Sequence, residues 1–173
     1  TRFEKALSRG GANAGAHEGA AKSLLAVGRI AEALKHAKKA SSLSPGNAAR
    51  LHLLGVVLLA SKRPKEAAAS FQRAAGKSPK SATVHLRWAD ALSRSGKARE
   101  ALKKITLALG LAGDKTRHLR GEILLSKARI LDTLKRCDEA RKSLREAKAL
   151  LGDVEAFSEK LKKTLERCAP GKE

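Results

Sequence analysis

The chain has 173 residues and carries 37 Lys and Arg against 17 Asp and Glu, for a formal net charge of +20. Hydrophobic residues make up 42% of it, mostly Ala and Leu, and aromatic residues only 2%. Because Ala and Leu favour helix and no run approaches the roughly 18 apolar residues of a membrane helix, the composition argues against a β-rich fold and a membrane-spanning segment.

Helical patterns recur along the chain at a fixed spacing. Pro45 and Pro79 stand 34 residues apart, and apolar positions repeat in one register before each of them and again before Gly113. These positions are Ala33, Ala37 and Ala40, then Ala67, Phe71 and Ala74, then Ala101, Ile105 and Ala108. A helical period of about 34 residues is typical of stacked helix-turn-helix repeats. We therefore predict an all-α fold of antiparallel helix pairs.

The pattern divides the chain into six parts. They are a truncated repeat that keeps only its second helix (1–13), repeats over 14–47, 48–81, 82–115 and 116–152, and a capping helix with a tail (153–173). The first full repeat is predicted to hold helices over 14–27 and 30–43, and the second helix of the next repeat to begin at Pro64, which suits a first helical turn.

The last part of the pattern departs from the period. Gly152 follows Gly113 by 39 residues, so we predict that the first helix of the fourth repeat, over 115–134, is about one turn longer than the others. A final amphipathic helix over 153–168, with Asp153 as its N-cap, would close the array.

These repeats resemble the tetratricopeptide repeat family. The residues that carry the resemblance are Leu54, Gly55, Ala67, Phe71, Ala74 and Pro79, with a second copy in Trp88, Ala89, Leu92, Ala101, Ile105 and Ala108. The resemblance implies a right-handed superhelical solenoid whose concave groove is lined by the first helix of each repeat. It also implies a protein–protein interaction module (an adaptor, assembly factor or chaperone-like scaffold) that binds a peptide or a partner helix in that groove. Trp88 is expected in the core.

Register predicts which residues line the groove. They are Lys22, His52, Val56, Leu59, Leu86, Asp90, Arg94, Leu125 and Arg129. The alternative is that these side chains support neighbouring helices. The best-known peptide clamp of the family uses Lys, Asn and Arg side chains to hold a pair of carboxylates at a peptide's C-terminus. The two Asn of that clamp are absent from the corresponding positions of this chain. We therefore do not expect it to recognise chaperone tails.

The second helices carry a recurring set of basic residues. They are Lys35, Lys38, Lys39, Arg73, Lys103 and Lys104. This basic ridge on the convex side is the rival site, and it would bind a polyanion such as an acidic protein, an anionic lipid or nucleic acid. The alternative is that these side chains only solvate the helices. With no Tyr and one Trp, the chain lacks the aromatic platforms of single-strand binders, so we do not expect sequence-specific nucleic-acid recognition.

Two cysteines bear on the cellular compartment of the protein without deciding it. Cys137 and Cys168 lie at nearly equal distances on either side of Gly152, which would put them at similar heights in an antiparallel helix pair. Either they form a disulfide, which would indicate a periplasmic or secreted protein, or they are unrelated and the protein is cytoplasmic. The Ala, Arg and Gly usage points to a bacterial source.

No catalytic pattern is present in the sequence. The five histidines (His17, His36, His52, His85 and His118) lack metal-ligand spacing, and no phosphate-binding Gly loop occurs. We expect no enzyme, no cofactor, no metal and no small-molecule substrate, and the sequence does not predict an oligomeric state.

Overall fold

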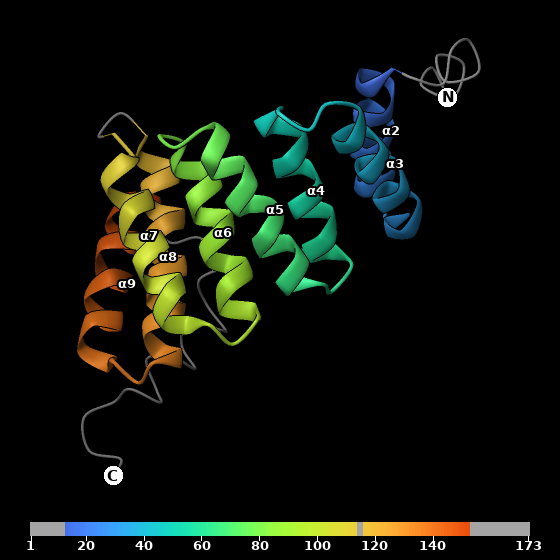
Figure 1. Ribbon diagram of the computed structural model, residues 1–173. Helices are drawn as coiled ribbons and strands as arrows, with labels where there is room; N and C mark the ends of the chain where they lie inside the picture. The colour runs from blue at the N-terminus through green and yellow to red at the C-terminus, as the bar shows by residue number, and fades with distance from the viewer. Residues whose placement is uncertain (1–12, 114–115, 153–173) are drawn as a thin grey trace. The chain divides into compact units, whose positions relative to one another are not determined.

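The computed structural model describes residues 13–113 and 116–152, and every regular element in these ranges is an α-helix (Figure 1). The helices are α2 (Ala14–Ala26), α3 (Ile30–Leu43), α4 (Ala48–Ala60), α5 (Pro64–Lys77), α6 (Ala82–Arg94), α7 (Ala98–Leu111), α8 (Arg117–Thr133) and α9 (Cys137–Leu151). The prediction of an all-α chain is confirmed for this part. The helices predicted in the truncated first repeat and in the C-terminal cap lie outside the described residues.

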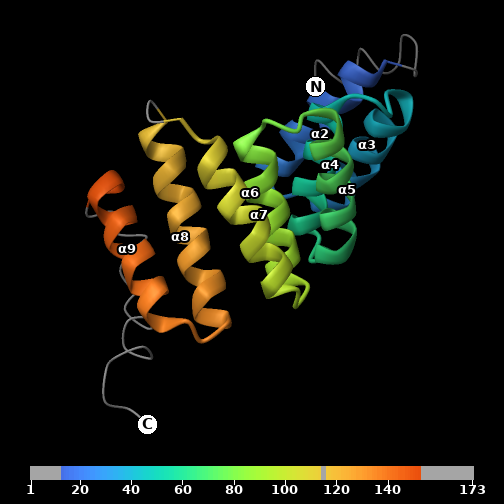
Figure 2. The same ribbon diagram turned by 60° about the vertical axis from the view of Figure 1, so that its left-hand side comes forward.

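The chain forms two compact units, Thr1–Lys80 and Ser81–Glu173. In the first unit α2 pairs with α3 and α4 with α5, and α4 also contacts both α2 and α3. In the second unit α6 pairs with α7 and α8 with α9, and α8 contacts both α6 and α7 (Figures 1 and 2). Within each unit, the first helix of one pair therefore rests on both helices of the pair before it, as expected for stacked repeats.

Short polar side chains start three of the four first helices. Asn13, Asn47 and Ser81 each accept a hydrogen bond from a backbone N–H in the first turn of α2, α4 and α6. Such caps satisfy amides that have no partner inside the helix. The fourth first helix, α8, follows Thr116 without a side-chain cap.

The turn inside each pair has one backbone geometry. The residue two positions before each second helix has a positive φ: 78° at Gly28, 56° at Lys62, 84° at Gly96 and 57° at Lys135. Glycine adopts this left-handed conformation readily, whereas a residue with a Cβ pays about 1–2 kcal/mol. The second and fourth pairs therefore carry a strained lysine where the first and third carry glycine.

Each second helix then begins with an exposed ion pair between a basic residue and the Glu three positions later. The pairs are Arg29–Glu32 (2.6 Å), Arg63–Glu66 (2.6 Å), Lys97–Glu100 (3.1 Å) and Arg136–Glu139 (2.5 Å). The Glu lies in the first turn, where a negative charge favours the helix dipole. Because the pairs are exposed, each contributes at most about 1 kcal/mol to stability.

Small residues let the helices of a pair approach closely. Ala33, Ala37 and Ala40 are fully buried on α3, as the repeating pattern predicts. On α4, Gly55 lies against the ring of Phe71 from α5, and a Cβ at position 55 would lie 2.7 Å from Cε1 and Cζ of that ring. Glycine is therefore required here by space.

A glycine also allows two helices to approach closely in the second unit. Gly121 on α8 lies against the side chain of Leu151 at the end of α9, and a Cβ at position 121 would overlap Cγ of Leu151. The α8 helix has 17 residues, whereas α2, α4 and α6 each have 13. The α8 helix is therefore about one turn longer than these three helices.

Candidate partner-binding surfaces

A group of charged side chains lies on α6 and α8, which contact each other in the second unit. An oxygen of the Asp90 carboxylate lies 3.2 Å from Nη2 of Arg94, and the other lies 4.0 Å from Nη2 of Arg129. Nη2 of Arg129 also donates a 2.9 Å hydrogen bond to Oγ of Ser126. The Asp90 side chain is only 15% exposed, while those of Arg94 and Arg129 are 56% and 52% exposed. One shielded carboxylate thus holds two accessible guanidinium groups.

A leucine adjoins these charges. Leu125 is half-buried and lies one turn before Arg129 on α8, so both residues share one side of the helix. We call Asp90, Arg94, Leu125 and Arg129 the α6–α8 face. It offers two sets of guanidinium donors next to an aliphatic side chain.

A related cluster joins α2 and α4 in the first unit. Glu18 on α2 accepts a 2.7 Å hydrogen bond from Nζ of Lys22 and a 3.1 Å hydrogen bond from Nε of Arg50 on α4. The hydrogen bond from Lys22 holds the pKa of Glu18 below its ordinary value of 4.5; burial opposes this, and the charge of Lys22 and the bond from Arg50 reinforce it. In both units, a carboxylate on one first helix binds an arginine on the next.

The other residues predicted to line the groove are buried to different extents. Lys22 is exposed, and His52, Val56 and Leu59 are half-buried on α4. The ring of His52 meets that of Phe71 edge-on, with centroids 5.4 Å apart, so the half-buried His52 packs against the core. Leu86 is different: it is 2% exposed, and so the expectation that it lines an open surface does not hold. Its aliphatic side chain is part of the packed interior.

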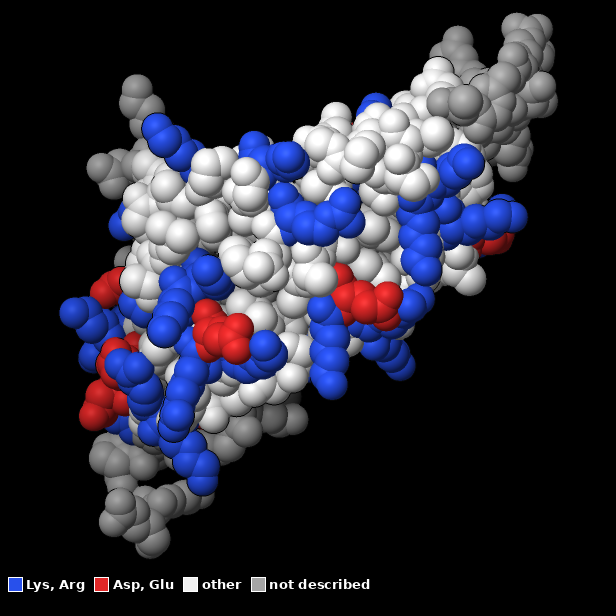
Figure 3. Space-filling model, in the orientation of Figure 1, with Lys and Arg blue, Asp and Glu red and all other residues white. Residues whose placement is uncertain are grey.

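The residues of the predicted basic ridge lie on second helices. Lys35, Lys38 and Lys39 on α3, Arg73 on α5 and Lys103 on α7 are exposed. Figure 3 shows basic side chains spread over one face of the molecule, with acidic ones in small groups among them.

Lys104 differs from the rest of the ridge. It is half-buried, and its Nζ lies 4.0 Å from the centroid of the Trp88 ring, a cation–π geometry. Trp88 is itself half-buried and stacks on His85 with centroids 6.1 Å apart. The expectation that Trp88 is a core residue is therefore wrong in part, because its ring lies at the edge of the core beneath a lysine.

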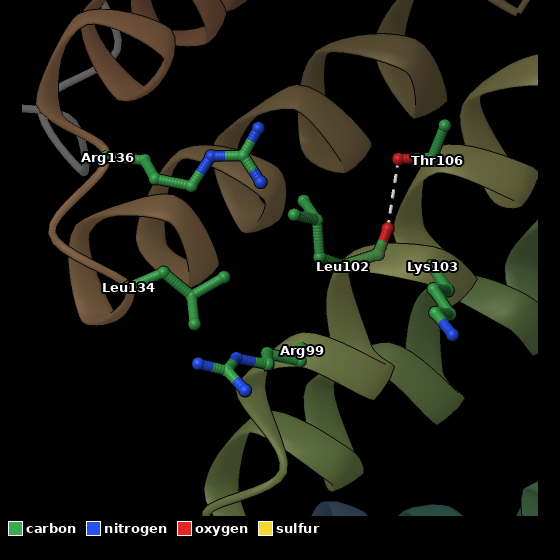
Figure 4. Close-up of a pocket in the computed structure, with 6 residues that line it drawn as sticks. All are labelled: Arg99, Leu102, Lys103, Thr106, Leu134 and Arg136. Atoms are coloured by element: carbon green, nitrogen blue, oxygen red, sulfur yellow. Dashed lines mark hydrogen bonds between the residues drawn. The ribbon is translucent and has the colours of Figure 1, made fainter.

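A pocket in the second unit was missed by sequence reasoning. It has a volume of about 700 Å³ and lies between α7 and the turn that joins α8 to α9 (Figure 4). It is lined by Arg99, Leu102, Lys103, Thr106, Leu134 and Arg136. Repeat registers align each helix with its counterpart in the next repeat, and so they do not reveal how a turn lies against the preceding pair.

Within residues 13–113 and 116–152, no group of three or more His, Cys, Asp or Glu side chains could hold a metal ion. No helix in these ranges is long and apolar enough to cross a membrane. Cys137 begins α9, whereas Cys168 lies outside the described residues, so their pairing stays a prediction, as does the compartment inferred from it.

The stacked helix pairs of each unit define a helical-repeat protein, a class that serves as scaffolds for protein interaction. Two family models match the chain, both described as tetratricopeptide repeat, over residues 19–82 and 58–114. Together they span more than half of the chain, and the protein belongs to the tetratricopeptide repeat family. The family predicted from the repeat residues is confirmed.

Several solved structures share this fold. YrrB, described as a TPR protein with an unusual peptide-binding site, has a TM-score of 0.76 at 22% identity, over 93% of this chain and 80% of its own. TTC0263, a thermophilic TPR protein from Thermus thermophilus, has a TM-score of 0.76 at 20% identity, over 95% and 87%. MamA has a TM-score of 0.75 at 17% identity, over 86% and 84%. At such identities the likeness shows the fold alone. No curated protein matches the sequence.

Proposed function

We propose that the protein is an interaction module that binds a peptide or helix of a partner protein on the α6–α8 face. One observation carries the proposal. The shielded carboxylate of Asp90 lies between two exposed arginines, 3.2 Å from Arg94 and 4.0 Å from Arg129, beside the half-buried Leu125.

The geometry suits a partner segment that carries both charge and apolar surface. Because Asp90 restrains Arg94 and Arg129 before binding, less side-chain entropy is lost when a partner docks. Guanidinium groups bind carboxylates through paired hydrogen bonds, which supply direction as well as affinity. An apolar side chain of the partner would then cover Leu125 and exclude water from the ion pairs. A segment with spaced acidic residues around an apolar one fits these requirements.

The basic ridge is the second candidate, favoured by the exposure of its lysines. Lys35, Lys38 and Lys39 on α3 are all exposed and form no ion pair with any described residue. A polyanion bound by such charges would dissociate as salt screens them, whereas contacts at Leu125 would resist salt.

The test is a selection of short peptides on the full chain, followed by affinity measurements on two charge-reversal variants. Arg94→Glu/Arg129→Glu changes the proposed site, and Lys35→Glu/Lys39→Glu makes the same charge change on the ridge. We expect the first variant to weaken the selected peptides at least about tenfold, or about 1.4 kcal/mol, and the second to change affinity little. If the second variant abolishes binding and the first does not, the ridge is the site and the proposal is wrong.

A further inference from the structure

We infer that the pocket between α7 and the α8–α9 turn is a second docking site, and that it takes an acidic peptide segment with an aliphatic anchor side chain. The pocket lies on a second helix and on the turn that leads into the next one, whereas the α6–α8 face is built from first helices. The inference does not depend on the proposed function, because no residue is shared between the two sites.

The lining of the pocket combines apolar surface with cations. Leu102 on α7 and Leu134 at the end of α8 are both half-buried and face the opening. Figure 4 shows their side chains between the guanidinium groups of Arg99 and Arg136, while Lys103 lies further along α7 and points away from the leucines. The volume of about 700 Å³ is within the range of sites that hold small ligands, so it has room for an aliphatic side chain and its neighbours.

The charges at the rim are poorly neutralised. Arg99 and Lys103 are exposed and form no ion pair with any described residue. Nε and Nη2 of Arg136 both lie close to Oε1 of Glu139, at 2.6 and 2.5 Å, which leaves Nη1 to bind a partner. The nearby Glu100 is already paired with Lys97 at 3.1 Å. Of the three basic residues that line the pocket, only Arg136 is paired with a described carboxylate, so the rim keeps an excess of positive charge that attracts anions.

The apolar floor decides which anion fits. A phosphate chain would pair with Arg99 and Arg136 but would leave Leu102 and Leu134 exposed to water, with no gain from apolar burial. A nucleic-acid base would need an aromatic platform, and none lines the pocket. The hydroxyl of Thr106 donates a hydrogen bond to the backbone carbonyl of Leu102 at 2.9 Å, so this donor is already used inside the protein and is not available to a ligand. An aliphatic side chain flanked by carboxylates matches both leucines and both arginines.

The experiment measures binding of a fluorescent peptide with one central leucine flanked by glutamates to the full chain, by anisotropy. The matched probes are the same peptide with serine in place of the leucine, and inorganic tripolyphosphate as a competitor. Arg99→Glu/Lys103→Glu reverses two exposed charges of the pocket, and Leu102→Asn removes one of the two leucines of its apolar floor without adding charge. Lys142→Glu/Arg145→Glu makes the same charge change on exposed positions of α9 that do not line the pocket.

We expect saturable binding of the leucine peptide with a dissociation constant below about 1 mM, and at least about tenfold weaker binding after Arg99→Glu/Lys103→Glu or Leu102→Asn. The control on α9 should keep more than about half of the affinity. Absence of saturable binding overturns the inference, and so does binding that neither pocket variant weakens, because the same peptide also suits the α6–α8 face. So does equal binding of the serine peptide, equal loss in the α9 control, or full displacement by tripolyphosphate, because each indicates attraction by net charge alone.

Discussion

The ammonium nitrogen of Lys104 on α7 lies 4.0 Å from the centre of the Trp88 ring on α6. This contact joins the two helices of one pair and withdraws one cation from the predicted ridge. It also gives the protein an internal reporter, because Trp88 is the only tryptophan in the chain.

The first prediction concerns this cation–π contact. Lys104→Ala should lower the free energy of unfolding by about 0.5–1 kcal/mol, the usual value for an exposed or half-buried pair. It should also change the emission of Trp88, which loses its charged neighbour. Lys103→Ala is the control, since Lys103 is exposed on the same helix and has no aromatic contact in the described structure. Equal changes in both variants would mean that the contact does not exist in solution.

A second prediction follows from the position of Gly55 against Phe71. Gly55→Ala should destabilise the protein by about 1–3 kcal/mol, because its Cβ would meet Cε1 and Cζ of the ring at 2.7 Å. Leucine lacks both atoms. In a Phe71→Leu background the clash is therefore absent, and Gly55→Ala should cost less than half of what it costs in the wild type. Alanine also favours the helix over glycine by about 0.5–1 kcal/mol, which offsets part of the remaining cost.

Urea denaturation followed by circular dichroism on the wild type, the two single variants and the double variant measures this coupling. Additive changes would contradict the close contact between α4 and α5.

The lysines with a positive φ predict a substitution that stabilises the protein, whereas the two predictions above are of lost stability. Lys62 has a φ of 56° in the turn between α4 and α5, where Gly28 and Gly96 occupy the equivalent turns. Lys62→Gly should stabilise the protein by up to about 1 kcal/mol, because relief of the left-handed conformation exceeds the entropy cost of glycine. Lys39→Gly, inside α3, should instead cost about 1 kcal/mol. A thermal melt that ranks Lys62→Gly below the wild type would show that the turn geometry is wrong.

The Glu18 cluster predicts a dependence of stability on pH. The hydrogen bond from Lys22 lowers the pKa of Glu18 in the folded state below 4.5, so folding favours the ionised form. The resulting stability is fully present above pH 4.5 and is lost as the pH falls through the lowered folded pKa. Glu18→Gln should therefore cost about 1 kcal/mol near neutral pH and progressively less in acid. A cost that is the same at both ends of a pH series of urea titrations would exclude this role of the carboxylate.

Much of the fold could be predicted because it depends on local patterns. The period of about 34 residues places the fully buried Ala33, Ala67 and Ala101 in one register, and the spacing of Gly113 and Gly152 predicts the longer α8. The helix predicted over 30–43 matches α3. These features follow from helix periodicity and turn chemistry, which act within one repeat.

The candidate sites were less predictable because they depend on contacts between repeats. Register suggested that Leu86 faces a partner, yet this side chain is buried, while Leu125 at a related position is half-exposed. Register also could not show that Asp90 approaches Arg129, which lies on the next first helix, or that Leu134 in a turn meets Leu102 on α7. The depth of a side chain and its partners across helices follow from packing, which sequence spacing does not specify.

The proposed function depends above all on the α6–α8 face, and hydrogen–deuterium exchange of the full chain with and without a saturating selected peptide tests it most directly. If the partner docks between Arg94 and Arg129, peptide binding should slow amide exchange in α6 and α8 and leave α3 and α5 unchanged. Slower exchange confined to second helices, with α6 and α8 unaffected, would contradict the proposal.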